Sequence, residues 1–310
     1  MYKRQVLAVL SVRHGWSPYL AIAAAVAVGA AIGAFQGSVF TQFGIPSFVV
    51  TLAGLLGWQG AQLEVLGATG TINLTDPAVT GLTSTFYDGP IGWTLAIAGI
   101  AVYAAVMLAG WRRKSKEGLR VPPLGALLLK LGLAAAAILV AVYVLNQDRG
   151  VPLAALIFIG FVVVFQFITT KTTFGRHIFA VGGNVEAARR AGIKVKRIRI
   201  VVFAIASSMA AIGGIMAASR LLAVNQSSGS GDFLLLAIAG PVIAGTSLFG
   251  GRGSVWTALL GALVIGSISN GMDLLALESS VKFMVTGAVL LIAVIIDALA
   301  RSRRQATGRV

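Results

Sequence analysis

Nine apolar segments, each close to the length needed to cross a bilayer, follow one another along this chain. A membrane-crossing helix needs about 17–25 predominantly apolar residues. The segments lie at residues 18–40, 46–66, 90–110, 124–145, 152–170, 199–222, 233–249, 254–272 and 281–300. The sequence therefore predicts an all-α fold, a polytopic transmembrane helical bundle.

The composition supports this prediction. Of the 310 residues, 57 % are hydrophobic and only 11 % are charged, so a water-soluble domain could not cover its apolar surface. A membrane β-barrel would show stretches of about ten residues with alternating hydrophobicity, whereas these runs are continuous. The chain has no cysteine, which excludes disulfides, zinc–thiolate and iron–sulfur sites, and cysteine nucleophiles.

Glycine and proline modify two of the segments. Gly240-Pro241 interrupts the short segment 233–249, which predicts a broken or re-entrant helix because proline removes a helical hydrogen bond. Gly29, Gly33 and Gly37 share one helix face and predict close helix packing. We expect a single transmembrane domain over residues 1–310, with its membrane core at 18–300.

The basic residues predict the orientation of the segments. The loop at 111–120, the loop at 171–199, Arg252 and the tail after 300 hold eighteen of the twenty-five lysines and arginines. Alternating the nine segments places all of them on one side, which the positive-inside rule makes cytoplasmic. The opposite loops hold most acids: Glu64, Asp76, Asp88, Asp148, Asp232, Asp273 and Glu278. The net charge of +15 is therefore a signal of topology, and nucleic-acid binding is not expected.

The N-terminus departs from this rule, because the same alternation places Lys3, Arg4 and Arg13 outside. Either the first segment is not a simple span, or the native chain has more sequence upstream. We expect the second.

Ionisable side chains are almost absent from the apolar segments. Lys130, Lys282 and Asp297 lie near segment ends, where they can reach the interface. No cluster of metal ligands or hydrolytic triad is evident. The stretch "GTSLFGGR", 245–252, lacks the lysine and the hydroxyl residue of a phosphate-binding loop and predicts a tight turn. We expect no catalysis, no cofactor and no metal.

Uncharged polar residues remain as candidates for a solute pathway. Gln59 and Gln62 lie next to Trp58, and Asn270 lies late in the eighth segment. Amides can bind sugar hydroxyls, and an aromatic face can cover sugar C–H groups. These four residues are the predicted pathway residues. The alternative is that such amides form hydrogen bonds between helices.

The loop at 171–199 contains the charged stretch "GGNVEAARRAGIKV", 182–195. Gly182 and Gly183 end the preceding structure, Asn184 can cap a helix N-terminus, and Gly192 is a typical residue after a helix end. Glu186 precedes Arg189 and Arg190 at spacings that allow ion pairs. The pattern predicts a helix of two turns. Because so short a helix is marginal in water, it needs a surface to pack on.

The stretch "GRHIFAVGGNVEAARRAGIKVKRIRIVVFAI", 175–205, closely resembles the cytoplasmic loop of permease subunits of bacterial sugar ABC importers of the ribose/xylose type. So do "GIPSFVVTLAGLLGWQG" at 44–60, "AIAGPVIAGTSLFGGRGSVWTALLGALVIGSISNGM" at 237–272 and "VKFMVTGAVLLIAVIID" at 281–297. "LNQDRGVP" at 145–152 is similar to the xylose branch. The family normally has further transmembrane sequence upstream, which nothing here matches.

The resemblance implies a coupling helix in this loop that docks on a separate ATP-hydrolysing subunit. The positions that correspond to it are Gly182, Gly183, Asn184, Glu186, Ala187, Ala188, Arg189, Arg190 and Gly192. The resemblance further implies a second permease copy, a periplasmic sugar-binding protein, the bacterial inner membrane, and D-xylose or a related pentose as solute. The alternatives are an ion-coupled secondary transporter, against which the lack of a buried carboxylate counts, and a membrane enzyme or scaffold.

Overall fold

The computed structural model describes residues 3–67, 70–118, 123–226, 233–248 and 250–306. Arg120, Asp232 and residue 249 lie outside the described residues. Within the described part, eight helices are long and apolar enough to cross a membrane, which confirms the predicted all-α polytopic architecture. They are α2 (Pro18–Phe43), α3 (Ser47–Leu66), α5 (Gly89–Lys116), α6 (Leu124–Asn146), α7 (Leu153–Lys171), α10 (Val195–Leu221), α12 (Trp256–Leu274) and α13 (Ser279–Ala306).

Shorter elements join these helices, and most of them were not predicted from the sequence. They are α1 (Lys3–Ala8), the π-helix η1 (Val9–Arg13), α4 (Pro77–Ser84), α8 (Thr173–Gly183), α9 (Val185–Arg190), α11 (Phe233–Ile243) and the strands β1 (Thr71–Asn73), β2 (Phe86–Tyr87), β3 (Val151–Pro152) and β4 (Ala223–Asn225). The chain forms two compact units, residues 80–157 and the remainder.

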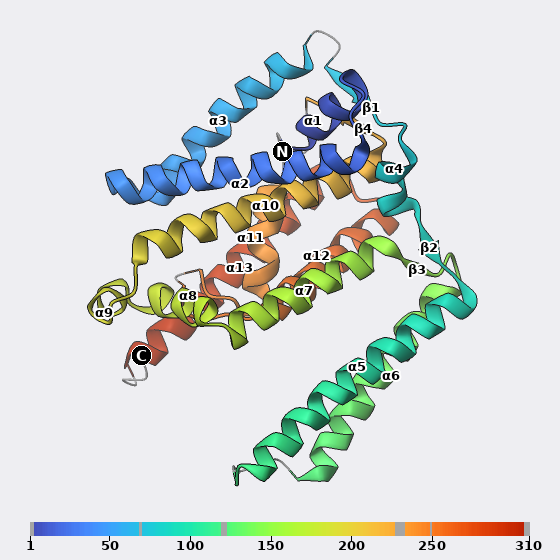
Figure 1. Cartoon of the computed structure of the whole chain (residues 1–310), viewed down its shortest axis with the longest axis vertical. Helices are drawn as coiled ribbons and strands as arrows, with labels where there is room; N and C mark the ends of the chain where they lie inside the picture. The colour runs from blue at the N-terminus through green and yellow to red at the C-terminus, as the bar shows by residue number, and fades with distance from the viewer. Residues whose placement is uncertain (1–2, 68–69, 119–122, 227–232, 249, 307–310) are drawn as a thin grey trace. The chain divides into compact units, whose positions relative to one another are not determined.

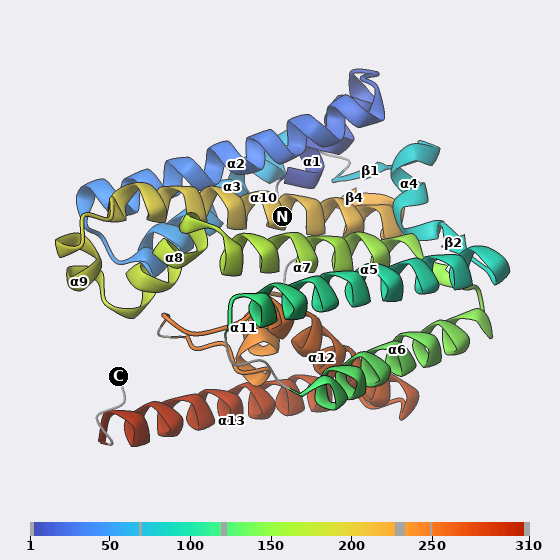
Figure 2. The same cartoon turned by 60° about the horizontal axis from the view of Figure 1, so that its bottom comes forward.

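Helices α2 and α10 lie side by side in the larger unit (Figures 1 and 2), and we call them the close-packed pair. The predicted glycine face of α2 is buried at Gly29, Gly33 and Gly37. A β-carbon at Gly33 would lie 2.4 Å from the carbonyl oxygen of Phe203 and 2.5 Å from Cβ of Ser207. Lipid offers no hydrophobic driving force between helices, so the van der Waals contacts that this close approach allows stabilise the pair.

The seventh apolar segment forms the short helix α11, which packs against α12 and α13 (Figure 2). Its eleven residues span about 16 Å, roughly half the hydrocarbon thickness of about 30 Å. Pro241 lies inside α11, and the amide groups of Ala244, Gly245 and Thr246 bond back to its last turn. The segment forms only a short helix, in line with the prediction of a broken segment. The helix continues through Gly240-Pro241, where the interruption was expected, and ends at Ile243, where the chain turns.

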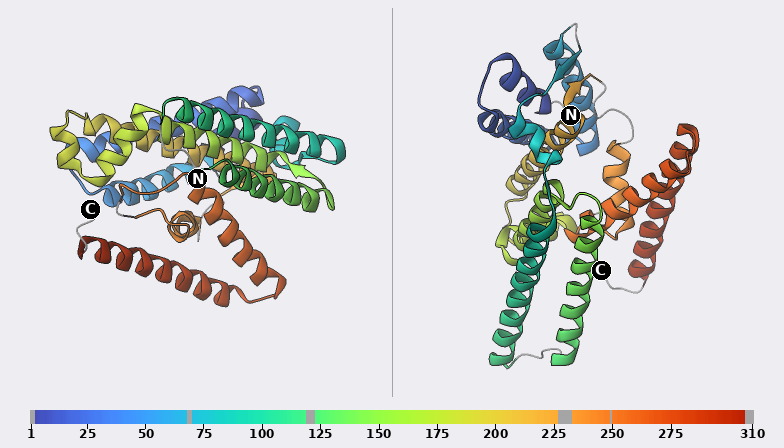
Figure 3. Two further views of the ribbon diagram at one scale, coloured as in Figure 1. Left: turned by 90° about the horizontal axis from the view of Figure 1, so that it is seen from below. Right: turned by 90° about the vertical axis from the view of Figure 1, so that its right-hand side faces the viewer.

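The smaller unit is a hairpin of α5 and α6, whose two long helices run beside each other (Figure 3). Ala96, Val142 and Val151 are buried together, with Trp93 and Ile138 packed on them. Strands β2 and β3 pair antiparallel where the hairpin ends, with Phe86 opposite Pro152 and Tyr87 opposite Val151.

Loops that the charge pattern places on one side of the membrane also meet in space. Strands β1 and β4 pair antiparallel, with Ile72 opposite Val224, and β2 pairs with β3; all four strands lie in loops predicted to be external. On the other side, Gly182 approaches Gly251 closely. These contacts agree with the alternation of segments from which the sidedness was predicted.

Arg13 also has a structural role, on the side predicted to be external. Its guanidinium donates hydrogen bonds of 3.0 Å to the carbonyl oxygens of Val65 and Leu66 at the end of α3. The last carbonyl groups of a helix have no intrahelical donor and carry a partial negative charge. This contact accounts for one basic residue that departs from the positive-inside pattern.

Candidate functional site

The predicted two-turn helix exists as α9, Val185–Arg190. The side-chain oxygen of Asn184 accepts a 2.9 Å hydrogen bond from the amide of Ala187, so Asn184 is the N-cap, as predicted. Helix α8 ends at Gly183, and Gly192 has a φ of +80° with its amide bonded to the carbonyl of Arg189. The predicted ends of this helix are thus confirmed.

One face of α9 packs on α8 and on the start of α10. Ala188 is buried with Val181 of α8 and Val195 of α10, and Val185, Ile193 and Ile198 pack around them. This cluster is the surface that so short a helix requires.

The opposite face of α9 is exposed, and its charges contribute little to folding. Glu186, Ala187, Arg189 and Arg190 are all exposed. Glu186 pairs with Arg189 at 3.1 Å, and no ion pair joins it to Arg190 among the described residues, contrary to one of the two predicted spacings. Since both partners are about 65 % exposed, the pair contributes only about 0.3 kcal/mol. The charges are therefore free to face a protein partner.

A backbone contact connects the α8–α9 junction to the turn between α11 and α12. We call it the glycine contact, formed by Gly182 and Gly183 with Gly250 and Gly251. A β-carbon at Gly182 would lie 2.6 Å from the amide nitrogen of Gly251, and one at Gly251 would lie 2.7 Å from Cα of Gly183. Gly250 and Gly251 also have positive φ angles of +86° and +73°. Only glycine fits both the angle and the space at Gly251.

The turn on the other side of the glycine contact is held to α12. The amide of Ser247 bonds to the carbonyl of Arg252 at 3.1 Å, which confirms the tight turn predicted for "GTSLFGGR". The hydroxyls of Thr246 and Thr257 are 2.6 Å apart, and Ser254 donates to the amide oxygen of Gln166 in α7 at 3.4 Å. A displacement of α9 can therefore reach α12 through few contacts: the glycine contact and the turn that follows it.

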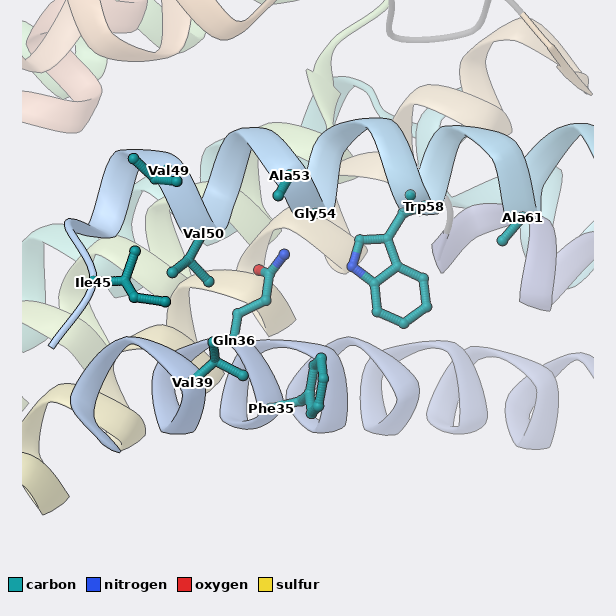
Figure 4. A pocket seen from close by; sticks show the side chains of 11 residues that line it. Phe35, Gln36, Val39, Ile45, Val49, Val50, Ala53, Gly54, Trp58 and Ala61 are labelled. Atoms are coloured by element: carbon teal, nitrogen blue, oxygen red, sulfur yellow. The ribbon is translucent and has the colours of Figure 1, made fainter. Parts of the chain in front are cut away.

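Trp58 lies in a pocket of about 480 Å³ between α2 and α3. Figure 4 shows its indole beside the side-chain amide of Gln36, which extends from α2 toward Gly54. The other lining residues are apolar or glycine. Gln36 was not among the predicted pathway residues. Its signal in the sequence was an amide within the first apolar segment.

The other predicted pathway residues have different surroundings. Gln62 is buried, and its amide nitrogen donates to the carbonyl oxygen of Gln226 at 2.6 Å. Gln226 lies in a turn after β4, so this bond is not one between helices. Gln59 is exposed on α3 and Asn270 on α12. Neither lines the pocket of Trp58, so the structure does not bring the four residues together. Among the described residues, no three of His, Cys, Asp and Glu come close enough to hold a metal ion.

Known proteins with similar sequences are transport permeases. Residues 5–294 match the family described as the permease component of branched-chain amino acid transport systems. The xylose transport system permease protein XylH of Escherichia coli K12 is 36 % identical over 96 % of this chain and 75 % of its own length. The XylH protein of Haemophilus influenzae is 35 % identical over 94 % of the chain and 77 % of its own length. The ribose import permease protein RbsC of E. coli K12 is 29 % identical over 90 % and 68 %. No solved structure matches the chain.

Proposed function

The chain belongs to this family of transport-system permease components, and from that premise we propose that it carries D-xylose or a related pentose across the bacterial inner membrane. It is the permease subunit of an ATP-driven sugar importer and not an enzyme, because ATP hydrolysis belongs to a separate subunit. The observation that carries the choice of sugar is the similarity to xylose permeases, which extends over 96 % of the chain.

The coupling mechanism that we propose begins at α9. The ATPase docks on the exposed residues Glu186, Ala187, Arg189 and Arg190, and Gly182, Gly183, Asn184, Ala188 and Gly192 hold the helix in place for it. When the ATPases close, α9 moves, and the glycine contact passes the displacement to the turn before α12. Because the turn has no flexible side chain at this contact, little of the movement is lost. A second permease copy completes the pathway, and a periplasmic binding protein delivers the sugar at the external loops.

A sugar-binding position at the pocket of Trp58 fits the proposed solute. The indole face can cover the C–H face of a pyranose, and the amide of Gln36 can bond its hydroxyls. Gln59 and Asn270 are exposed, and we propose that they face the passing solute. For Gln62 we propose a role at the external edge of the pathway, where its amide holds the end of β4.

Uptake by reconstituted protein tests this function. Proteoliposomes would contain the chain with its ATPase, with the binding protein outside and labelled D-xylose as solute. We expect accumulation that requires internal ATP and proceeds without any ion gradient. If excess unlabelled ribose or arabinose inhibits the uptake of labelled xylose more strongly than unlabelled xylose does, that pentose is the preferred solute. Uptake that follows a proton or sodium gradient without ATP would contradict the proposal.

The same assay tests the pathway residues. Trp58→Ala and Gln36→Ala should each reduce uptake about tenfold, as expected for losing a stacking face or a hydrogen-bonding amide. Leu56→Ala is the matched control, because Leu56 lies on the same helix, is exposed and does not line the pocket. Equal uptake by all three variants would remove this pocket from the pathway.

A further inference from the structure

A second pocket, which we call the basic pocket, lies where α2 ends and α10 begins. Its volume is about 700 Å³. Phe40, Thr41 and Gly44 form the wall on the α2 side, and the opposite wall contains four cationic residues: Arg189, Lys194, Lys196 and Arg199. No carboxylate is among the described residues that line it.

The cations of this pocket have few partners in the chain. Arg189 pairs with Glu186, and Arg199 lies 5.0 Å above the ring centroid of Phe40, a contact that orients the guanidinium without neutralising it. Lys194, Lys196 and Arg199 form no ion pair among the described residues. Positive charges held around one cavity repel each other, and a bound anion removes this repulsion.

Two exposed aromatic residues flank Gly44, a lining residue of the basic pocket, in the sequence. Phe43 is 72 % exposed and Phe48 is 64 % exposed. Helices α2 and α10 are long and apolar enough to cross a membrane, so we expect their ends at the level of the lipid headgroups. A ligand that fits both the pocket and these aromatic residues has an anionic head and an apolar tail.

We propose that the basic pocket binds the headgroup of an anionic phospholipid on the cytoplasmic side, with its acyl chains against Phe43 and Phe48. The shared chemistry is that of a phosphate group, which lysine and arginine bind well. The exposed aromatic residues favour a lipid over free phosphate. Because Arg189 belongs both to α9 and to the pocket, the lipid would also support the position of α9.

Native mass spectrometry of the purified full chain tests the proposal. Delipidated protein is titrated with phosphatidylglycerol, phosphatidylethanolamine or inorganic phosphate, and bound molecules are counted. We expect one phosphatidylglycerol per chain to bind at least tenfold more tightly than phosphatidylethanolamine. The double variant Lys194→Gln, Lys196→Gln should weaken this binding about tenfold, since each cation near anionic lipid contributes severalfold.

The control is Lys171→Gln, Arg197→Gln, which removes two charges from the same loop but none that line the pocket. It should bind as the wild type does. If inorganic phosphate binds as tightly as the lipid, the ligand is a soluble phosphate and the proposal is wrong. It is also wrong if both double variants lose binding equally. In a second experiment, hydrogen exchange is measured with and without the ATPase subunit. If neither lipid binds and only the ATPase subunit protects the pocket from exchange, the proposal is wrong as well. The single variant Lys196→Gln gives the answer if the double variant does not fold.

Discussion

The close-packed pair and the α11–α12 region differ in how regular their helices are. Helices α2 and α10 are uninterrupted over 26 and 27 residues, and glycine allows their backbones to touch along the shared face. Helix α11 is eleven residues long and contains Pro241. It leads into a turn with four glycines at positive φ: Gly245, Gly250, Gly251 and Gly253. We therefore expect the first region to stay in place and the second to be the region that moves.

The position of α9 gives this difference a functional meaning. Its buried face packs on the first residues of α10, so it starts from a firm support. Its neighbour α8 touches the turn between α11 and α12 through the glycine contact. In a permease driven by a separate ATPase subunit, we expect one region that stays in place and one region that moves. The α8–α9 junction contacts both regions.

Changing Gly33 to alanine should have the largest effect on the close-packed pair. The new β-carbon would meet backbone and Cβ atoms that cannot move aside, so the helices must separate. We expect a loss of about 1–3 kcal/mol in the free energy of unfolding, measured by thermal unfolding in detergent. Gly160→Ala is the control, because nothing lies within 4 Å of that position. Equal loss in both variants would show that the pair is not closely packed.

Changing Gly251 to alanine should leave assembly intact and impair coupling. We expect sugar-stimulated ATP hydrolysis to fall roughly tenfold, within the usual range of coupling free energies. Gly245→Ala introduces similar backbone strain, since φ is +101° there, but touches nothing within 4 Å. If Gly245→Ala lowers hydrolysis as much as Gly251→Ala does, strain in the turn explains the effect and the glycine contact does not.

Changing Asn184 to alanine should have the smallest effect, because it removes only the N-cap of α9. Such a cap contributes about 1 kcal/mol, which corresponds to about fivefold faster hydrogen exchange at residues 185–190. Asn184→Ser keeps a capping oxygen and should restore slow exchange. Exchange that is unchanged in Asn184→Ala would mean that the apolar cluster alone holds α9.

The features predicted well from the sequence are those that depend on near neighbours in the chain. The apolar segments, the glycine face of α2 and the ends of α9 follow from local patterns, because helix periodicity and capping operate over a few residues. Asn184 and Gly192 have the roles that their residue types indicated.

The features that were missed depend on contacts between distant segments. Nothing in "GGNV" or "LFGGR" indicates that Gly182 faces Gly251, since glycine pairs are common in any turn. The place of Gln36 beside Trp58 depends on how α2 and α3 are rotated, which an apolar helix pattern does not define. The strands β1 and β4 have three residues each, too few for alternation to be recognised.

The absence of cysteine allows the central claim, that the ATPase docks on α9, to be measured directly. A single cysteine at Ala187 lies on the exposed face of α9, and one at Ser115, at the exposed end of α5, serves as the control. Labelling by a water-soluble maleimide is followed with and without the ATPase subunit. We predict that the ATPase protects position 187 and leaves position 115 reactive. Equal labelling of position 187 in both samples would contradict the account.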